Sequence, residues 1–307
     1  MKVFEKTDED VKTCYLKAGK GIGNALRKAR EICTPGMKLL DFTEQVEQVV
    51  LDSDCGFGFP LNCSLDYHAA HYSSPIGDES IIPEHGLLKV DAGAHCNGYI
   101  ADAAITINLG GDAGIYQELS DAAEEALNAA VEAFRPGHTL NEVGVVINNV
   151  MKKHGVKPVS NLGGHELGHF NLHAGEFVPN VPQPENLVEI AEGDAYAIEP
   201  FSTNGVGAIH NGPEIYIYRY EKARKKNISM PDKRVQQQFK DHFSTLPFSP
   251  RWITFIPPTQ IDQFIRKFSS WGVLDSYNIL DESPRALVAQ FEHTVIVEHD
   301  GAVVTTQ

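Results

Sequence analysis

Two segments of this chain repeat each other, and the repeat limits the folds that are open to it. Residues 34–50 and 135–151 both have a Pro-Gly pair at their second and third positions and continue with apolar residues at the 3–4 spacing of a helix. A shift of 101 residues places Pro35 on Pro136. Both segments are preceded by amphipathic stretches with helical spacing, at 14–32 and 116–134. The sequence therefore predicts two related halves, each with a pair of helices.

A short apolar strand that ends in a carboxylate follows the helices of each half. Residues 87–91 end in Asp91, and residues 194–199 end in Glu199. Chance similarity is the alternative explanation for the two Pro-Gly segments, and the matching strands weigh against it. We therefore expect an α+β fold in which helices are followed by strands in each half.

The pattern of the two halves is interrupted between residues 202 and 276. This part contains the basic run 222–226, helical spacing at 235–243 and 260–268, and several prolines. The predicted domains are a catalytic domain, residues 1–201 and 277–307, and an inserted helical subdomain, residues 202–276. The basic run is expected on a solvated face, and contact with an acidic partner such as ribosomal RNA is the alternative.

Charge and composition exclude several classes of function. A net charge of −15 argues against a nucleic-acid-binding surface, because phosphate contacts need clustered Lys and Arg. No apolar run approaches the roughly 18 residues of a membrane span, and the N-terminus has no signal-peptide pattern. The five cysteines form no C-x-x-C pair, so disulfides are not expected. We expect a cytoplasmic monomer with no membrane partner and no specific nucleic-acid partner.

Two aspartates are predicted to meet on one face of a β-hairpin. Asn97-Gly98 is a strong signal for a two-residue turn. Pairing around this turn makes Asp91 and Asp102 diagonal neighbours on one face, about 7–8 Å apart at Cα. Like charges among apolar residues are costly unless a cation lies between them. A divalent metal is therefore favoured over the alternative, in which one aspartate is solvated at a sheet edge.

Two further carboxylates, Glu199 and Glu292, lie in equally apolar predicted strands. Four strand carboxylates and one histidine suit a pair of divalent metal ions, and oxygen and imidazole ligands favour Co, Mn, Fe or Zn. Two ions about 3.5–4 Å apart can act together on one substrate. The sequence therefore predicts a two-metal hydrolytic site.

The histidine comes from the segment His165-Glu-Leu-Gly-His169. An H-E-x-x-H zinc motif requires a regular helix, and the glycines in and around this segment disfavour one. We therefore interpret His165 as a metal ligand, His173 as a residue that faces substrate, and His169 as a surface or structural residue. A zinc-protease helix is the alternative.

The candidate ligands, in this order, resemble the metal-binding five of the methionine aminopeptidases and their pita-bread relatives. The gap between Glu199 and Glu292 resembles the type 2 subclass, and the short N-terminus resembles its archaeal form. The resemblance implies a pita-bread fold, with two pseudo-symmetric halves around a curved antiparallel sheet and a winged-helix-like insertion. The matching segments are Ala69-Ala-His-Tyr72, Val90-Asp-Ala-Gly93, Tyr99-Ile-Ala-Asp102, Leu172-His-Ala-Gly175, Ile198-Glu-Pro-Phe201 and Gln290-Phe-Glu-His293.

The resemblance also implies a role for each ligand. Asp91 would bind one metal, and Asp102 and Glu292 would bridge both. His165 and Glu199 would complete the second site. Glu199 would shuttle a proton while a metal-bridging hydroxide attacks the first peptide bond.

Substrate contacts are implied in the same way. His71 and His173 would hydrogen-bond the substrate carbonyl or the developing oxyanion. A narrow apolar pocket would accept the flexible Met side chain. The implied substrates are nascent polypeptides with N-terminal Met and a small second residue, met during transient contact with the ribosome. The implied pocket residues are Phe59, Leu172, His210 and Tyr277.

Two other functions are left open by the sequence. A proline-directed peptidase of the same architecture resembles this ligand set, but such proteins usually carry a separate N-terminal domain. Here the first predicted helix begins near Cys14, which disfavours that function. A binding module that has lost its metal ligands is disfavoured because none of the five positions is substituted.

Overall fold

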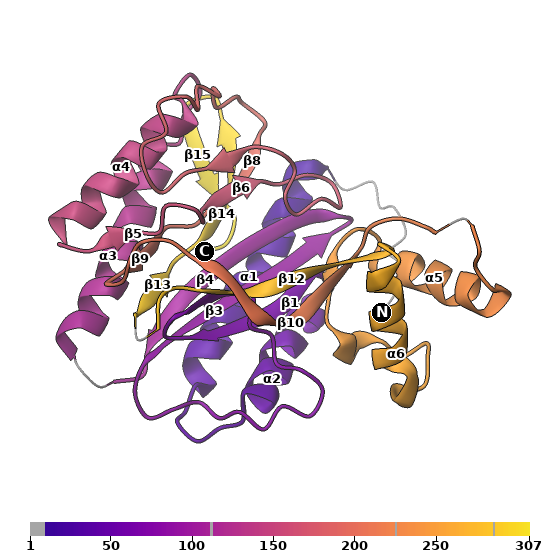
Figure 1. The fold of residues 1–307 in the computed structure, drawn as a ribbon. Coiled ribbons are helices and arrows are strands. Elements are labelled where there is room, and N and C mark those ends of the chain that lie inside the picture. The colour runs from indigo at the N-terminus through magenta and orange to yellow at the C-terminus, as the bar shows by residue number, and fades with distance from the viewer. Residues whose placement is uncertain (1–9, 111–112, 225, 285) are drawn as a thin grey trace.

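The computed structural model describes residues 10–110, 113–224, 226–284 and 286–307. Within these residues, four antiparallel sheets lie at the centre. Helices α1 and α2 pack against the strands of the first half of the chain, and α3 and α4 cover the strands of the second half (Figure 1). The first half comprises α1 (Val11–Ile32), α2 (Leu39–Asp52), β1 (Gly56–Leu65), β2 (His68–Ala70), β3 (Leu87–Cys96) and β4 (Tyr99–Asn108). The second half begins with α3 (Ala113–Ala133), α4 (Leu140–Lys153), β5 (Lys157–Pro158), β6 (Gly164–Glu166), β7 (Phe177–Val178), β8 (Ala195–Ile198) and β9 (Phe201–Thr203).

The next elements along the chain are β10 (His210–Tyr220), α5 (Met230–Phe243), β11 (Pro247–Phe248), η1 (Pro250–Trp252), η2 (Pro258–Gln260), α6 (Ile261–Ser270) and β12 (Leu274–Asp281). Of these, α5 and α6 lie apart at one end of the molecule (Figure 1). The chain then returns to the second half through β13 (Val288–Gln290), β14 (His293–Glu298) and β15 (Gly301–Val304).

The predicted internal repeat is confirmed at the starts of α2 and α4, whose bounds are related by the same shift of 101 residues. Gly36 and Gly137 precede these helices with φ of 84° and 83°, a conformation that glycine adopts without strain. Their amides donate to the carbonyls of Ile82 and Ile190, at 2.8 and 3.1 Å. Both halves therefore use one supersecondary unit, as the α+β prediction required.

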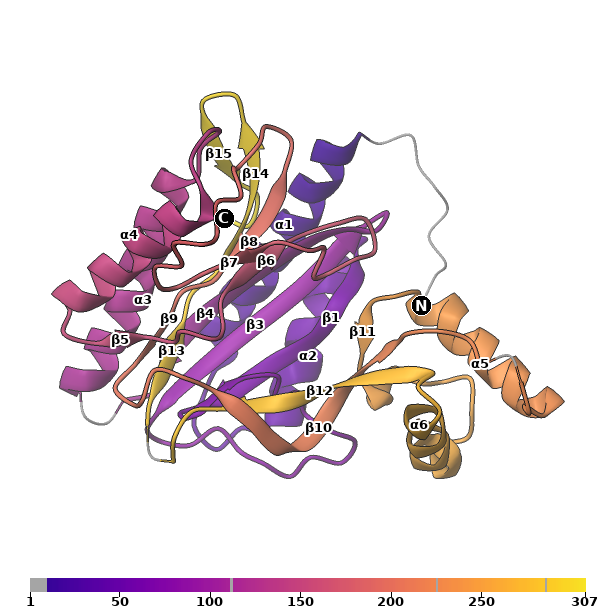
Figure 2. The same cartoon turned by 45° about the horizontal axis from the view of Figure 1, so that its top comes forward.

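Each half buries its own hydrophobic core between helices and sheet. In the first half, Ile22 and Phe42 from the helices pack with Leu88 from β3. In the second half, Leu127 and Ile147 belong to a separate cluster. Figure 2 shows α1 and α2 behind β1, β3 and β4, which leaves the opposite face of these strands turned toward the rest of the sheet system.

The predicted hairpin register is confirmed, because Asp91 on β3 lies opposite Ala104 on β4. β4 then contacts the segment between β13 and β14. The amides of Ala104 and Glu292 donate to each other's carbonyls at 3.4 and 3.0 Å. The Thr294 hydroxyl donates to the Asp102 carbonyl at 2.8 Å and accepts from its amide at 2.7 Å. The two halves of the chain therefore meet at Asp102 and Glu292.

Both helices predicted between residues 202 and 276 are present, as α5 and α6. α5 begins five residues before the predicted start at 235, because Ser229 caps it by accepting from the Asp232 amide. Phe239 and Phe268 are buried in a hydrophobic cluster of their own between these helices. The bounds 202–276 for a separate subdomain stay a prediction. No helix among the described residues is long and apolar enough to cross a membrane.

A histidine at the end of α4 gives the first testable prediction. His154 Nδ1 lies 2.6 Å from Glu118 Oε1, and its Nε2 lies 2.8 Å from Glu125 Oε2, both on α3. The hydrogen bond to Glu125, with a further contribution from Glu118, raises the pKa of His154. The folded state therefore gains stability below the pKa of about 6.5 that an unfolded histidine has, and loses it as pH rises through the raised pKa.

We expect His154→Gln to lower the unfolding free energy by up to about 1 kcal/mol at pH 5.5, because both glutamates are half exposed and solvent screens the pair. At pH 8.5 the unfolding free energies of the variant and the wild type should differ less. Thermal unfolding of both proteins at the two pH values measures this difference. An equal loss at both pH values would show that the charge of His154 contributes nothing.

Candidate metal centre

The five predicted metal ligands line a single cavity of about 230 Å³. All five side chains are buried, and each comes from a different strand or from the residues next to one. Asp91 lies on β3, Asp102 on β4 and His165 on β6, while Glu199 follows β8 and Glu292 lies between β13 and β14. Both halves therefore contribute ligand candidates to the place where their strands join.

The candidate ligand atoms lie close enough to share an ion. His165 Nε2 lies 3.6 Å from Asp102 Oδ2 and 3.9 Å from Glu199 Oε1. One ligand atom each from Asp102, His165 and Glu292 lie within 4.8 Å of one another. Side chains of these types at such separations can converge on a divalent cation.

The electrostatics of the cavity favour a bound cation. Burial raises the pKa of Asp91 to about 7. The pKa values of Asp102, Glu199 and Glu292 are raised well above their usual range, first by burial and then by the neighbouring carboxylates. Burial also lowers the pKa of His165 to about 4, so the imidazole is neutral and can act as a ligand. A cation would relieve the repulsion that makes these carboxylates hard to ionise.

Unpaired oxygen atoms in the cavity fit the same interpretation. Within the described part of the chain, Asp91 Oδ1, Asp102 Oδ1 and Glu292 Oε1 are buried and accept no hydrogen bond. Buried polar atoms in proteins are nearly always paired. A carboxylate and imidazole donor set with unpaired oxygens therefore fits one or more hard or borderline divalent ions.

Comparison with known proteins assigns the family. The model of metallopeptidase family M24 matches residues 13–299. The chain belongs to metallopeptidase family M24. It is 37% identical to the methionine aminopeptidase of Methanothermobacter thermautotrophicus, over 95% of this chain and 98% of that protein. It is 39% identical to that of Saccharolobus solfataricus, over 97% and 99%.

Solved structures of low sequence identity show the same fold. A thermophilic Arx1 superposes with a TM-score of 0.82 at 16% identity, over 98% of this chain and 91% of that chain. A methionine aminopeptidase from Thermotoga maritima superposes with a TM-score of 0.69 at 21% identity, over 98% of both chains. The predicted pita-bread fold and metallo-aminopeptidase class are therefore confirmed, and M24 membership implies the use of a divalent metal.

One residue of this M24 site was given no role from the sequence. Gln290 is buried, and its Nε2 donates to Glu199 Oε2 and to Glu292 Oε2, both at 3.2 Å. Gln290 precedes Glu292 by two residues, a spacing that places both on the same side of an extended segment. That spacing is the signal that could have identified it.

We expect Gln290→Leu to weaken metal binding by about 10–100-fold, because residues that hold ligand side chains in place typically contribute that much. Isothermal titration of chelated protein with Mn²⁺ measures the affinity. Gln236→Leu is the control, since Gln236 is also buried but lies in α5, where its Oε1 accepts from the Arg224 amide. Unchanged affinity in the Gln290 variant would contradict a positioning role.

The H-E-x-x-H segment is not helical. His165 lies in strand β6, and residues 167–176 contain turns and bends. His169 is exposed, and its Nε2 lies 2.8 Å from the Asn97 carbonyl oxygen. Its ring centroid lies 4.9 Å from that of Tyr99. The zinc-protease alternative is therefore excluded, because the two histidines do not share a helix face.

The predicted substrate-facing residues divide into two groups. His71, His173, Phe59, Leu172 and Tyr277 line the cavity together with the ligand candidates. His210 does not line it, because it is exposed at the start of β10 opposite Asp281. Ile217, further along the same strand, lines the cavity instead. The lining residues that sequence reasoning missed are Asn62, Ala70, Asn161, Leu162, Gly163, Phe177, Ile217 and Pro247.

Proposed function

We propose that this M24 metallopeptidase removes the N-terminal methionine from nascent proteins. The proposal rests on one observation: four buried carboxylates and a neutral imidazole share a cavity whose remaining wall is largely apolar. The names of the archaeal relatives support the same activity.

The ligand set supports two divalent ions, chosen from Co, Mn, Fe and Zn by ligand chemistry. Asp91, Asp102, His165, Glu199 and Glu292 would hold them, with Asp102 and Glu292 shared between the two sites. Bound ions of this kind supply Lewis-acid chemistry for the cleavage of a peptide bond.

Glu199 would accept and return a proton during the reaction. Its pKa is raised by burial and by the nearby charge of Asp91. A general base works best when its pKa lies near the working pH, and this shift is in that direction. Glu199 is thus a candidate both for a ligand and for the proton-transfer group.

The two substrate-facing histidines would have different partners. His71 Nδ1 lies 3.0 Å from the Asn278 carbonyl oxygen, which can only accept, so Nδ1 carries the proton. Burial lowers the pKa of His71, and the neutral ring then offers Nε2 as an acceptor. His71 would therefore bind a substrate N–H, in place of the carbonyl or oxyanion that the family resemblance implied for it. His173, whose ring centroid lies 4.4 Å from that of His165, would bind the substrate carbonyl.

The apolar part of the cavity suits an unbranched side chain. Phe59, Leu172, Phe177, Ile217 and Tyr277 are among the residues that line it. Met is flexible and polarizable, so it can fill an irregular apolar pocket of this kind better than a branched residue can.

Peptide cleavage by chelated protein that is titrated with Mn, Co, Fe or Zn tests the proposal. Metal-restored release of free Met from Met-Gly-Met-Met, and of nothing else, is the expected result. Cleavage of Gly-Pro would assign the protein to the proline-directed peptidases. The absence of turnover with every metal would favour a binding module. Metal analysis of the active form determines whether one or two ions are bound.

We further propose that the protein works as a cytoplasmic monomer on chains that emerge from the ribosome, with residues 202–276 as an inserted subdomain. Lys222 and Lys226 are exposed in the basic run, which supports a transient contact with the anionic ribosome surface. Lys225 of the same run lies outside the described residues.

A further inference from the structure

Three separate parts of the chain form one wall of the substrate cavity. β1 contributes Phe59 and Asn62, the segment directly after β2 contributes His71, and β11 contributes Pro247. These parts lie far apart in the sequence, and Pro247 belongs to the region predicted as an insertion. The shape of the cavity therefore depends on contacts that hold the three parts in a fixed relation.

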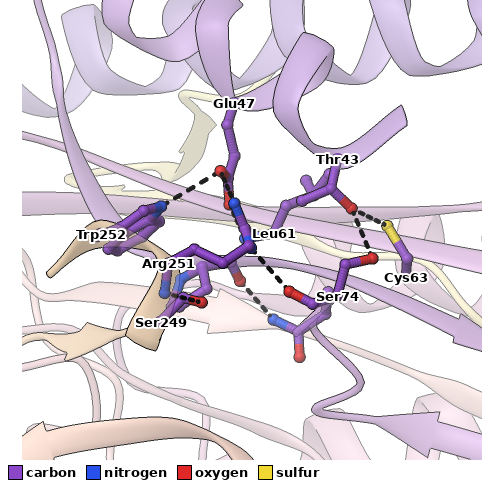
Figure 3. A network of polar contacts seen from close by, with 10 residues as sticks. Thr43, Glu47, Leu61, Cys63, Ser74, Ser249, Arg251 and Trp252 are labelled. Atoms are coloured by element: carbon purple, nitrogen blue, oxygen red, sulfur yellow. Dashed lines mark hydrogen bonds and ion pairs between the residues drawn. The ribbon is translucent and has the colours of Figure 1, made fainter. Parts of the chain in front are cut away.

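A buried ion pair between Glu47 and Arg251 belongs to a network of polar contacts that also includes Leu61 and Ser74 (Figure 3). Arg251 Nη1 and Nη2 donate to the two carboxylate oxygens of Glu47 on α2, at 3.0 and 2.8 Å. The side chains of Arg251 and Glu47 are only 7% and 8% exposed. This bidentate arrangement fixes both the distance and the angle between the two groups.

Two of the three parts are hydrogen-bonded to this pair, and the third is continuous in sequence with Arg251. The Leu61 amide, between Phe59 and Asn62, donates to Glu47 Oε1 at 3.3 Å. Arg251 Nε donates to the Ser74 carbonyl, three residues after His71, at 2.7 Å (Figure 3). Arg251 itself lies four residues after Pro247.

The Leu61 amide bonds Glu47 at a point where the hydrogen-bond ladder between β1 and β3 is irregular. The pairing of β1 with β3 changes register between Phe59 and Asn62. At such an irregularity the strand loses regular ladder bonds, and its buried amide needs another acceptor. Glu47 provides that acceptor. Trp252 reinforces the contact, because its ring stacks on Phe57 at 4.3 Å and its Nε1 donates to Glu47 Oε2 at 3.3 Å.

We propose that the Glu47–Arg251 pair is a positioning element that sets the width of the apolar end of the cavity, and thereby the selectivity for the first side chain of the substrate. This inference rests on the proposed aminopeptidase function. A buried ion pair adds little net stability compared with apolar residues of similar size. Its bonds to Leu61 and Ser74, however, are directional, and apolar residues could not reproduce them.

The test compares wild type with Arg251→Met and with the double variant Glu47→Leu/Arg251→Met, which leaves no unpaired charge. The substrates are Met-Ala-Ser and Leu-Ala-Ser peptides. We expect KM for the Met peptide to rise, metal content to stay at the wild-type level, and the Met-over-Leu ratio of kcat/KM to fall by about tenfold, the scale of one pocket contact. Arg251→Lys, which keeps the charge but not the bidentate bond, should have an intermediate ratio.

Hydrogen–deuterium exchange provides a readout that needs no activity. In the Arg251 variants, exchange should rise together in residues 57–64, 71–78 and 245–253. Lys267→Met is the matched control, because it removes the Lys267–Asp232 pair, 2.6 Å long, within the insertion. It should leave both the Met-over-Leu ratio and exchange in 57–64 unchanged.

The outcomes distinguish failure of the positioning role of the Glu47–Arg251 pair from failure of the proposed aminopeptidase function. An unchanged Met-over-Leu ratio in the double variant, or faster exchange confined to 245–253, would overturn the positioning role. If wild type releases no Met from the first peptide, the proposed function fails, and the exchange pattern still decides whether the pair couples the three parts. If Arg251→Met does not fold, the double variant and Arg251→Lys supply both measurements.

Discussion

Asp102→Asn is expected to reduce kcat/KM for an N-terminal Met peptide by at least about a thousandfold, the scale of a lost electrostatic contact at the reacting centre. The Asp102 carboxylate lies with His165 and Glu292 where one ion could contact all three. Its Oδ2 is 3.6 Å from His165 Nε2. Asn has nearly the same shape, but it carries no charge and turns an N–H donor group toward the site. Because Asp102 is proposed to be shared between two ions, the substitution should weaken the binding of both.

The same variant, which is expected to lose activity, should gain stability when metal is absent. Chelated wild type buries four neighbouring carboxyl groups, and it is costly either to keep them charged or to protonate them. Removing one charge should raise the melting temperature of chelated Asp102→Asn above that of chelated wild type. Added metal should raise the melting temperature of the wild type much more than that of the variant.

Metal analysis after dialysis, Met release and thermal unfolding measure these effects together. Asp281→Asn is the control, because Asp281 is a buried carboxylate that pairs with His68 outside the cavity lining. It should keep the wild-type metal content. Two retained ions and near-normal turnover in Asp102→Asn would refute a bridging role for Asp102.

The sequence predicted the features that depend on local rules. The Asn97-Gly98 turn and the two-residue period of strands fix the register of β3 and β4, so the meeting of Asp91 and Asp102 could be predicted. The Pro-Gly turns that precede the repeated helices could be predicted from local sequence rules as well. Glu199, Glu292 and His165 were selected by residue type and apolar context, and only the resemblance to a family grouped them with the two aspartates, because no local rule brings β6, the end of β8 and the segment before β14 to one place.

Residues whose position depends on irregular pairing were missed. β10 pairs with β12 with changes of register between Asn211 and Ile215 and again between Ile215 and Ile217. Counting alternate residues from His210 therefore fails to identify Ile217 as the residue that faces the cavity. Pro247 was missed for a different reason: its place in the wall depends on contacts of Arg251 with segments that precede it by about 180 to 200 residues.

Gly164→Ala is expected to destabilise the fold by about 3 kcal/mol, the upper range for forcing extra atoms into a packed site. A Cβ at Gly164 would lie 2.2 Å from the carbonyl oxygen of Ala197 on β8 and 3.1 Å from Val178 Cβ on β7. β6 lies between these two strands, so neither side has room for it. The backbone of β6 would have to move.

That movement should also weaken metal binding, because His165 follows Gly164 and pairs with Ala197. Its Nε2 would shift relative to Asp102 and Glu199. Denaturant unfolding of the chelated protein measures the stability loss, and Mn²⁺ titration measures the affinity. Gly301→Ala is the control, since a Cβ there would meet no atom within 4 Å.

A stable Gly164→Ala protein with normal metal affinity would show that β6 can shift without moving its ligand. The expected result would instead explain why an apparent H-E-x-x-H motif follows glycine in this chain. Glycine at 164 disfavours a helix, and in the sheet it is the residue that lets β6 approach β8 closely enough for His165 to reach the carboxylates. The feature that argues against a zinc helix is therefore the same feature that positions the metal-ligand candidate.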